Sequence, residues 1–191
     1  MPAPLRAAER QLLVVGDSLS AEYGLARGQG WVALLGERLK TTPAGKGWSL
    51  VNASISGDTT SGGLSRLPGL LERHKPAITI IELGGNDALR GLSLTATDAN
   101  LRKMVALARD AGSRPMLIGM QMPPNYGAAY AKQFSDLYRR IADAERIALV
   151  PFLLEGFGDD TDWFQPDRIH PAAKAQPRML DNVWPVLEPL L

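Results

Sequence analysis

The sequence predicts an α/β fold in which a mostly parallel sheet carries helices on both faces. Short apolar segments that hold much of the β-branched content alternate with longer segments whose apolar residues recur about every 3.6 positions. Several of the short segments are continuously apolar, which is typical of strands covered on both faces. No internal repeat, low-complexity tract or linker interrupts the pattern. We therefore expect one domain over residues 1–191, with residues 1–10 as a flexible N-terminal extension.

The elements follow one another in regular order. Five strands are expected over residues 11–16, 49–55, 78–85, 115–122 and 147–153. The helices between them have glycine or proline close to their ends. They are expected over residues 30–40, 60–75, 95–112 and 128–145. A last helix is expected over residues 171–191, interrupted near Pro177 and Pro185.

The composition is that of a globular protein and narrows the functional classes. Hydrophobic residues make up 45% and charged residues 21% of the chain, which argues against a disordered or fibrous protein. The net charge of +1, from 21 basic and 20 acidic residues, predicts neither nucleic acid nor an anionic membrane as a partner. No cysteine is present, so disulfides, zinc ribbons and thiol catalysis are excluded.

Two further features bear on location and assembly. No apolar run approaches the roughly 18–20 residues that span a bilayer, so we expect no stable membrane insertion. The opening MPAPLRAAER lacks the apolar core of a signal peptide, although a processed signal replaced by a new Met1 would leave the same start. We expect a periplasmic protein if a signal was removed and a cytoplasmic one otherwise, and in either case a monomer.

The predicted architecture indicates where a site would lie. Ligands on open α/β sheets bind beyond the carboxyl ends of the strands. The segments that follow the expected strands hold a hydroxyl, glycine amides, an asparagine, acids and a histidine. These segments cover residues 16–20, 54–60, 84–91, 122–127 and 165–171.

A serine, a histidine and an acid in these segments suggest nucleophilic catalysis. Ser18 follows an expected strand near a helix start, and is either an ordinary helix N-cap or a nucleophile at the rim of the sheet. A nucleophilic serine needs a base. Of the two histidines, His74 stands at an expected helix end, where a cation is favourable without any catalytic role. His170 follows Asp167 by three positions, so the carboxylate can hold one imidazole nitrogen; a plain surface turn is the alternative.

The same segments supply hydrogen-bond donors for an oxyanion. Gly57 can present a backbone amide without a side chain in the way, and Asn86 can donate from its side-chain amide. Each has an ordinary alternative as a turn or cap residue. We expect Asp58 to cap the following helix and Asp17 to be structural. The coincidence of donors, nucleophile and base at one end of a sheet favours a site for acyl transfer.

Four segments, GDSLS, NASISGDT, GGND and DRIHP, resemble in order and spacing the signature blocks of the SGNH (GDSL) hydrolase superfamily. They are most similar to its bacterial branch of thioesterase–lysophospholipase and arylesterase enzymes, and the similarity extends from about residue 12 to about residue 177. The resemblance implies a flavodoxin-like three-layer αβα sandwich with a five-stranded parallel sheet. It also implies a serine esterase that hydrolyses small-molecule esters or thioesters through an acyl-enzyme, without a metal or cofactor.

The resemblance also implies roles for individual residues. Ser18 corresponds to the nucleophile, His170 to the base and Asp167 to the acid. The oxyanion-hole donors correspond to the Ser18 amide, the Gly57 amide and the Asn86 side chain.

The resemblance further implies how an acyl chain would be held. The loop over residues 88–94 is expected to move over the acyl chain, and Met122 and Pro123 to contact it. The alternative is that Met122 fills a gap in the core and Pro123 shapes a loop. Glu22 departs from the family pattern, which usually has a small residue there. We expect its carboxylate to disfavour anionic substrates such as acyl-CoA.

Two other functions remain open at this point. One is a metal-dependent phosphohydrolase with Asp17, Asp87 and Asp167 around Mg²⁺, since hard cations favour carboxylates. The other is a flavodoxin-like module that binds a flavin or phosphoanion, with Ser18 and Ser20 as phosphate ligands. The second leaves the Asp167–His170 pair unexplained.

Overall fold

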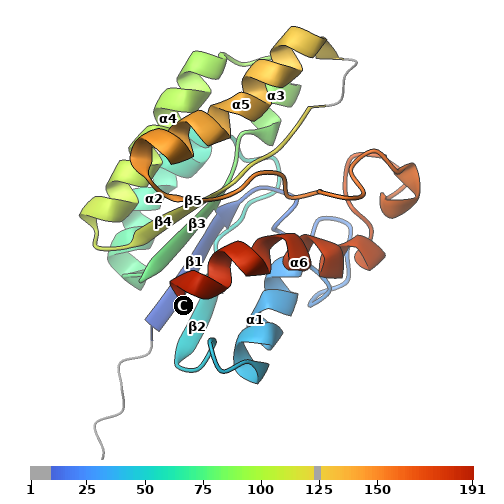
Figure 1. Cartoon of the computed structure of the whole chain (residues 1–191). Coiled ribbons are helices and arrows are strands. Elements are labelled where there is room, and N and C mark those ends of the chain that lie inside the picture. The colour runs from blue at the N-terminus through green and yellow to red at the C-terminus, as the bar shows by residue number, and fades with distance from the viewer. Residues whose placement is uncertain (1–9, 123–125) are drawn as a thin grey trace, which may run out of the picture.

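The computed structural model describes residues 10–122 and 126–191, and it places five parallel strands in one sheet (Figure 1). The strands are β1 (Arg10–Gly16), β2 (Trp48–Asn52), β3 (Ile78–Glu82), β4 (Arg114–Ile118) and β5 (Ala148–Val150). Their order is β2-β1-β3-β4-β5, and every neighbouring pair is parallel. The predicted five-stranded parallel sheet is confirmed. The strand order reverses between β1 and β3, and in open α/β sheets ligands bind at the carboxyl ends of the strands at such a reversal.

Helices form a layer on each face of the sheet. They are α1 (Trp31–Thr41), α2 (Thr60–His74), α3 (Gly85–Leu89), α4 (Leu94–Asp110), α5 (Ala128–Glu145) and α6 (Gln176–Leu187). Helices α1 and α6 lie together on one face, and α2, α4 and α5 lie on the other (Figure 1). The predicted three-layer αβα arrangement is therefore confirmed.

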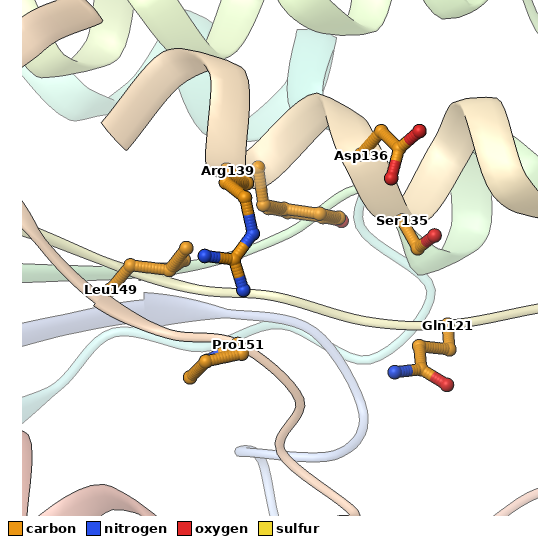
Figure 2. A pocket seen from close by; sticks show the side chains of 7 residues that line it. Gln121, Ser135, Asp136, Arg139, Leu149 and Pro151 are labelled. Carbon is orange, nitrogen blue, oxygen red and sulfur yellow. The ribbon is translucent and has the colours of Figure 1, made fainter. Parts of the chain in front are cut away.

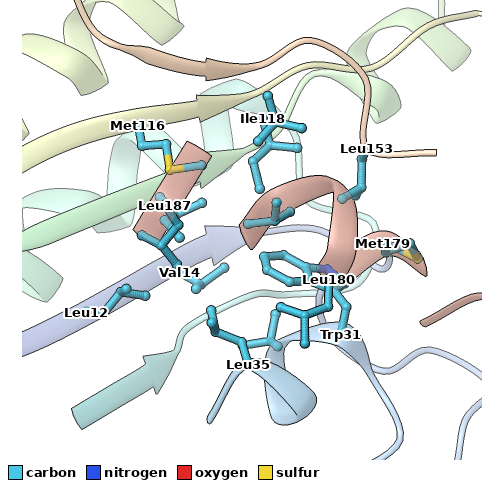
Figure 3. Packing of buried hydrophobic residues seen from close by; sticks show 14 of the residues in the cluster. Leu12, Val14, Trp31, Leu35, Met116, Ile118, Leu153, Met179, Leu180 and Leu187 are labelled. Atoms are coloured by element: carbon cyan, nitrogen blue, oxygen red, sulfur yellow. The ribbon is translucent and has the colours of Figure 1, made fainter. Parts of the chain in front are cut away.

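The first strand explains why both faces must be covered. Leu12, Leu13, Val14 and Val15 are all fully buried, although successive side chains of a strand point to opposite faces. Leu12 and Val14 pack in the cluster on the α1/α6 face, and Leu13 and Val15 pack in the cluster beneath α2, α4 and α5. Figure 3 shows side chains of β1, α1 and α6 directed toward one another in the first cluster. Burial of each such side chain contributes about 1.5–3 kcal/mol.

The strands end earlier than the apolar pattern predicts. β4 ends at Ile118 and β5 at Val150, whereas the apolar segments continue to residues 122 and 153. Met122 and Leu153 are nevertheless buried, 8% and 0% exposed, because the loops they occupy fold back on the core. An apolar sequence reports burial, so it does not distinguish a buried strand from a buried loop.

The last helix was expected to be interrupted near Pro177 and Pro185. A short 3₁₀ turn (Ala173–Ala175) gives way to α6 directly before Pro177, whereas α6 continues through Pro185, so only the second break is wrong. Pro177 lies in the first turn of α6, where its missing N–H has no helical partner to lose, and Pro185 lies inside the helix. The short helix α3 was not expected, because five residues are too few to show a helical spacing.

The N-terminal extension falls largely outside the described residues. Arg10, which we expected in that extension, is instead the first residue of β1, and its Nη1 donates to the Leu191 carbonyl at 2.7 Å. Within residues 10–122 and 126–191, no helix has the length and apolar character needed to cross a bilayer.

Candidate active site

The chain leaves β1 through a turn that frees the Ser18 hydroxyl. Asp17 caps this turn, since its Oδ1 accepts a hydrogen bond from the Leu19 amide at 3.0 Å and its carbonyl accepts from the Ala21 amide at 3.0 Å. The segment is a series of turns rather than an α-helix. Ser18 is therefore not an N-cap, and its hydroxyl is available for another partner.

Glycine is required where the strand meets this turn. A Cβ at Gly16 would lie 2.8 Å from Glu82 Oε2 and 2.9 Å from the Ser20 side chain. Both neighbours are buried, and Ser20 Oγ donates to Glu82 Oε2 at 2.7 Å. Ser20 also accepts from Trp31 Nε1 at 3.2 Å. The Ser20 hydroxyl is thus committed inside the protein, which removes it as a phosphate ligand.

Ser18, His170 and Asp167 form an unbroken hydrogen-bond chain. Ser18 Oγ lies 2.9 Å from His170 Nε2, across 152 positions of the sequence. His170 Nδ1 lies 2.7 Å from Asp167 Oδ2. Because a carboxylate only accepts, Nδ1 carries the proton, and Nε2 is left as an acceptor for the serine hydroxyl. This is the geometry that a serine nucleophile and its base require.

Local backbone contacts hold Asp167 and His170 in place. Phe164 and Pro171 form an antiparallel bridge, and the Gln165 amide donates to the His170 carbonyl at 2.8 Å. Asp167 Oδ1 accepts from the amides of Ile169 and His170 at 2.9 and 3.0 Å. Desolvation alone would raise the pKa of Asp167, but these hydrogen bonds and the imidazole lower it to about 2. Asp167 is therefore ionised over any working pH.

Tyr23 lies against one side of the His170 ring, and no sequence motif pointed to this residue. Its ring centroid lies 4.2 Å from that of His170, with the planes tilted by 35°. Gln165 Nε2 donates to the Tyr23 carbonyl at 2.8 Å, which ties the turn after Ser18 to the loop that carries His170.

Glu22 precedes Tyr23 and holds the same turn. It adopts a left-handed backbone conformation with φ of 59°, and its Oε1 accepts from the Gly28 and Gly30 amides at 2.9 and 2.8 Å. The carboxylate is thus engaged by two backbone amides. Its effect on anionic substrates stays a prediction.

Asn86 links the segments that carry Ser18 and Gly57. Its Nδ2 donates to Asp17 Oδ2 at 3.0 Å and to the Asp58 carbonyl at 2.9 Å. Asp17 precedes Ser18, and Asp58 follows Gly57, so the three expected oxyanion donors lie on segments joined by one side chain. Gly57 has φ of 80°, a conformation that favours glycine.

Asp58 does not cap the helix that follows it. The α2 cap is Thr59, whose Oγ1 accepts from the Gly62 amide at 3.2 Å. Asp58 instead pairs with Arg66, Oδ2 to Nε at 2.8 Å, and both side chains are largely buried. The prediction chose the wrong one of two adjacent polar residues, because both types are common N-caps.

Two buried acids lie beneath the nucleophile. Glu82 is fully buried, and burial followed by the nearby Asp17 carboxylate raises its pKa well above the ordinary range. Burial also raises the pKa of Asp17 from 3.8 to about 6. The hydrogen bonds from Leu19 and Asn86 and the nearby His170 lower this pKa, but by less than burial raises it. Glu82 Oε1 has no hydrogen-bond partner among the described residues, which fits a neutral carboxyl group.

The acids proposed for a magnesium site do not converge. Asp17 binds Asn86, and Asp167 binds His170. Asp87 is buried and accepts from the Thr60 amide and hydroxyl at 2.9 and 2.5 Å. The described part of the chain holds no group of three or more His, Asp or Glu placed to bind a metal ion.

The remaining expected residues make no contact that assigns them a role, or they lie outside the described part of the chain. His74 is in the last turn of α2, as expected for a histidine at a helix end. Met122 is 8% exposed and packs in the cluster beneath α2, α4 and α5, so substrate contact by it stays a prediction. Pro123 lies outside the described residues.

A separate polar cavity of about 140 Å³ lies between α5 and the edge strand β5 (Figure 2). Its lining includes Gln121, Ser135, Asp136, Arg139, Leu149 and Pro151. It contains no serine–histidine pair, and Ser18 follows β1, which lies three strands away from β5 in the sheet order. The hydrogen-bond chain of Ser18, His170 and Asp167 therefore lies apart from this cavity.

Comparison with known proteins adds independent evidence. Residues 14–176 match the model of the GDSL-like Lipase/Acylhydrolase family. The chain is 54% identical to "Esterase TesA" of Pseudomonas aeruginosa over 97% of this chain and 92% of that one. It is 40% identical to "Thioesterase 1/protease 1/lysophospholipase L1" of Escherichia coli K12, over 97% and 86% of the two chains.

A solved structure is similar over nearly the whole fold. The psychrotrophic esterase EstA from Pseudoalteromonas sp., in a form inhibited by monoethylphosphonate, superposes with a TM-score of 0.87 at 36% identity. The comparison covers 94% of this chain and 97% of that one.

Proposed function

The chain belongs to the GDSL-like lipase/acylhydrolase family and is a carboxylic ester hydrolase, and we propose that Ser18, His170 and Asp167 form its catalytic triad. The observation that carries the assignment is the hydrogen-bond chain from Ser18 Oγ through the imidazole to Asp167. The metal-dependent and flavin-binding alternatives are not favoured by the relatives.

Acylation begins at Ser18. Its oxygen attacks the carbonyl carbon of an ester or thioester while His170 Nε2 takes the hydroxyl proton. Asp167 holds the imidazole by Nδ1 and stabilises the imidazolium that forms. The tetrahedral intermediate then collapses, and the leaving alcohol or thiol takes the proton from Nε2. Water repeats the same steps on the acyl-serine and releases the acid.

The oxyanion is held by the Ser18 and Gly57 amides and by Asn86 Nδ2. Both Nδ2 hydrogens already have protein acceptors, on Asp17 and on the Asp58 carbonyl. Donation to the substrate therefore requires that the hydrogen on the Asp58 carbonyl be shared with or released to the oxyanion. Asp17 keeps the other hydrogen and with it the orientation of the amide.

The substrates are aryl esters, short-to-medium acyl esters, acyl-CoA thioesters and lysophospholipids, which share one carbonyl chemistry. The names of the relatives, an esterase and a thioesterase/lysophospholipase, support this range. Met122 and the loop over residues 88–94 would border the acyl chain. The enzyme acts as a monomer, and in the periplasm if the native precursor carries a signal peptide; cell fractionation and sedimentation would test these two points.

Labelling with a fluorophosphonate tests the triad. The full chain is treated with the probe in the presence of a chelator, and intact mass and peptide mapping then locate the adduct. A single adduct on the Ser18 peptide, lost in His170→Ala, is expected. Folded wild-type protein that forms no adduct, or an adduct on another residue, would refute the assignment.

A further inference from the structure

Two of the expected oxyanion donors lie on separate segments that α3 joins. Asn86 lies in α3, whereas Gly57 lies in the segment before α2. Asn86 Nδ2 donates to the Asp58 carbonyl at 2.9 Å, and Arg90 Nη2, directly after α3, donates to the Gly57 carbonyl at 2.8 Å. Water reaches both contacts, because Arg90 is exposed and Asn86 is partly exposed. These two contacts alone therefore hold the segments together only weakly.

Asp87 makes a buried contact between the same two segments. It is 3% exposed, and it accepts from the Thr60 amide on Oδ2 at 2.9 Å and from the Thr60 hydroxyl on Oδ1 at 2.5 Å. Thr60 is the first residue of α2 and is fully buried. An amide at the start of a helix has no partner within the helix, and a carboxylate is favourable there. Asp87 thus ties α3 to a residue only three positions after Gly57.

Helix α4 supplies further polar groups to this contact. Thr97 Oγ1 lies 3.3 Å from Asp87 Oδ1, and Asn100 Nδ2 donates to Thr60 Oγ1 at 3.0 Å. The Thr60 hydroxyl therefore accepts from Asn100 and gives its own proton to Asp87. Side chains from α2, α3 and α4 meet at one buried carboxylate, and such a satisfied network is rigid.

Helix α3 depends on contacts of this kind for its position. Its five residues form little more than one turn, which is too short to be stable by its own hydrogen bonds. Its buried residues are Asp87 and Ala88. Ala88 packs in the cluster beneath α2, α4 and α5, but apolar packing is not directional, whereas the hydrogen bonds of Asp87 are. A shift of α3 would carry Asn86 with it.

We propose that Asp87 is a positioning residue of the oxyanion hole, which sets the place of the Asn86 side-chain amide relative to the Gly57 amide. Oxyanion donors must lie about 2.7–3.1 Å from the charge that develops in the transition state. A misplacement of about 1 Å can cost on the order of 10²-fold in rate. The inference rests on the proposed function and adds to it a residue that acts from inside the protein.

A matched pair of threonine variants tests the contact from the α2 side. Thr60→Val and Thr79→Val each remove the hydroxyl of a fully buried threonine and nearly keep its shape. The Thr79 hydroxyl bonds Ser113 Oγ at 2.7 Å near the amino ends of β3 and β4, at the opposite end of the sheet from Ser18. Initial rates on a p-nitrophenyl ester are measured well below the unfolding midpoint of each variant. Thr60→Val should lower kcat roughly tenfold with KM within about twofold, whereas Thr79→Val should leave both within about twofold.

Asp87→Asn tests the same contact from the α3 side. The asparagine keeps the shape of the side chain but has one acceptor oxygen in place of two. It cannot accept from both the amide and the hydroxyl of Thr60 on separate oxygens, so α3 should move. The kcat should fall roughly 10–100-fold, again with KM within about twofold, because the lost interaction forms only in the transition state.

A readout in the oxyanion hole separates positioning from a loss of stability. In the fluorophosphonate adduct of Ser18 the phosphonyl oxygen occupies the place of the oxyanion, so its ³¹P resonance reports the hydrogen bonds of the hole. In Asp87→Asn and Thr60→Val this resonance should move from the wild-type position toward that of the unfolded adduct. In Thr79→Val it should keep the wild-type position even if the unfolding midpoint falls as far.

Several outcomes would overturn the inference. These are a wild-type kcat and ³¹P resonance in the folded Asp87→Asn and Thr60→Val variants, or equal losses in Thr60→Val and Thr79→Val. If Asp87→Asn does not fold, Thr60→Val decides alone. Wild-type protein that labels at Ser18, together with unchanged variants, would refute the positioning role and leave the triad in place. Wild-type protein that forms no adduct at Ser18 would refute the triad, and the positioning role with it.

Discussion

Asp17→Asn should make the enzyme slower and its fold less sensitive to pH. The carboxylate accepts two hydrogen bonds, from the Leu19 amide on Oδ1 and from Asn86 Nδ2 on Oδ2, both at 3.0 Å. An asparagine has one acceptor oxygen. If that oxygen serves Leu19, the new amide group faces the Asn86 amide group, donor against donor. Asn86 must then turn over or move, and the oxyanion loses its side-chain donor.

The expected loss follows from that lost donor. Removal of one oxyanion-hole donor typically costs about 10²–10³ in kcat, and the KM should change little. Initial rates on a p-nitrophenyl ester give both constants. Because Asp17 acts through Asn86, the double variant Asp17→Asn/Asn86→Ala should be no slower than the slower single variant. Near-wild-type kcat in Asp17→Asn, or fully additive losses, would refute the positioning role.

Whereas Asp17→Asn should slow the enzyme, it should raise the free energy of unfolding relative to wild type near neutral pH. A pKa raised by burial from 3.8 to about 6 means that the folded protein binds more protons than the unfolded chain between these pH values. Its free energy of unfolding therefore falls as pH rises through this window, by on the order of 3 kcal/mol above pH 6. Asn cannot ionise, so this fall does not occur in the variant. The free energy of unfolding of Asp17→Asn relative to wild type should therefore increase by up to that amount between pH 4 and pH 7.

Urea unfolding at the two pH values measures this gain. The lowered pKa of Asp167 is present in both proteins and largely cancels in the comparison. Loss of the Asp17 charge also lowers the raised pKa of Glu82, so the measured difference contains the titration of both buried acids. Asp181→Asn, at a side chain that is 56% exposed and pairs with Arg38, is the matched control and should show little pH-dependent difference. A difference between Asp17→Asn and wild type that does not vary with pH would refute the argument from burial.

Other predictions concern the same site. Asn86→Ala should remain folded and lose about 10²–10³ in kcat; near-full turnover would remove Asn86 from the oxyanion hole. Activity should fall on the acid side as His170 becomes protonated, and a flat rate from about pH 4 to 9 would contradict a histidine base. Glu22→Gln keeps an acceptor for the Gly28 and Gly30 amides but removes the charge, whereas Glu22→Gly removes both. If rates on acyl-CoA relative to a neutral ester are unchanged in both, the charge of Glu22 does not select substrates; a change in Glu22→Gly alone would assign the effect to the turn.

The sequence by itself determined the layers and the place of the site. Continuous apolar runs such as residues 12–15 predict strands buried on both faces, because apolar side chains on both faces of a strand must both be removed from water. The Asp167–His170 pair could also be predicted, since an acid three positions before a histidine can reach it within one turn. Ser18, Gly57 and Asn86 were indicated by their position after strands, where parallel topology brings loops together.

Only the tertiary structure decided which contacts those residues make. The Ser18–His170 contact spans 152 positions, and no local pattern encodes it. Asp17 caps the turn and also accepts a hydrogen bond from Asn86. Asp58, which was expected to cap α2, instead forms an ion pair with Arg66. These outcomes depend on which strands are adjacent and on what each buried polar group finds within reach.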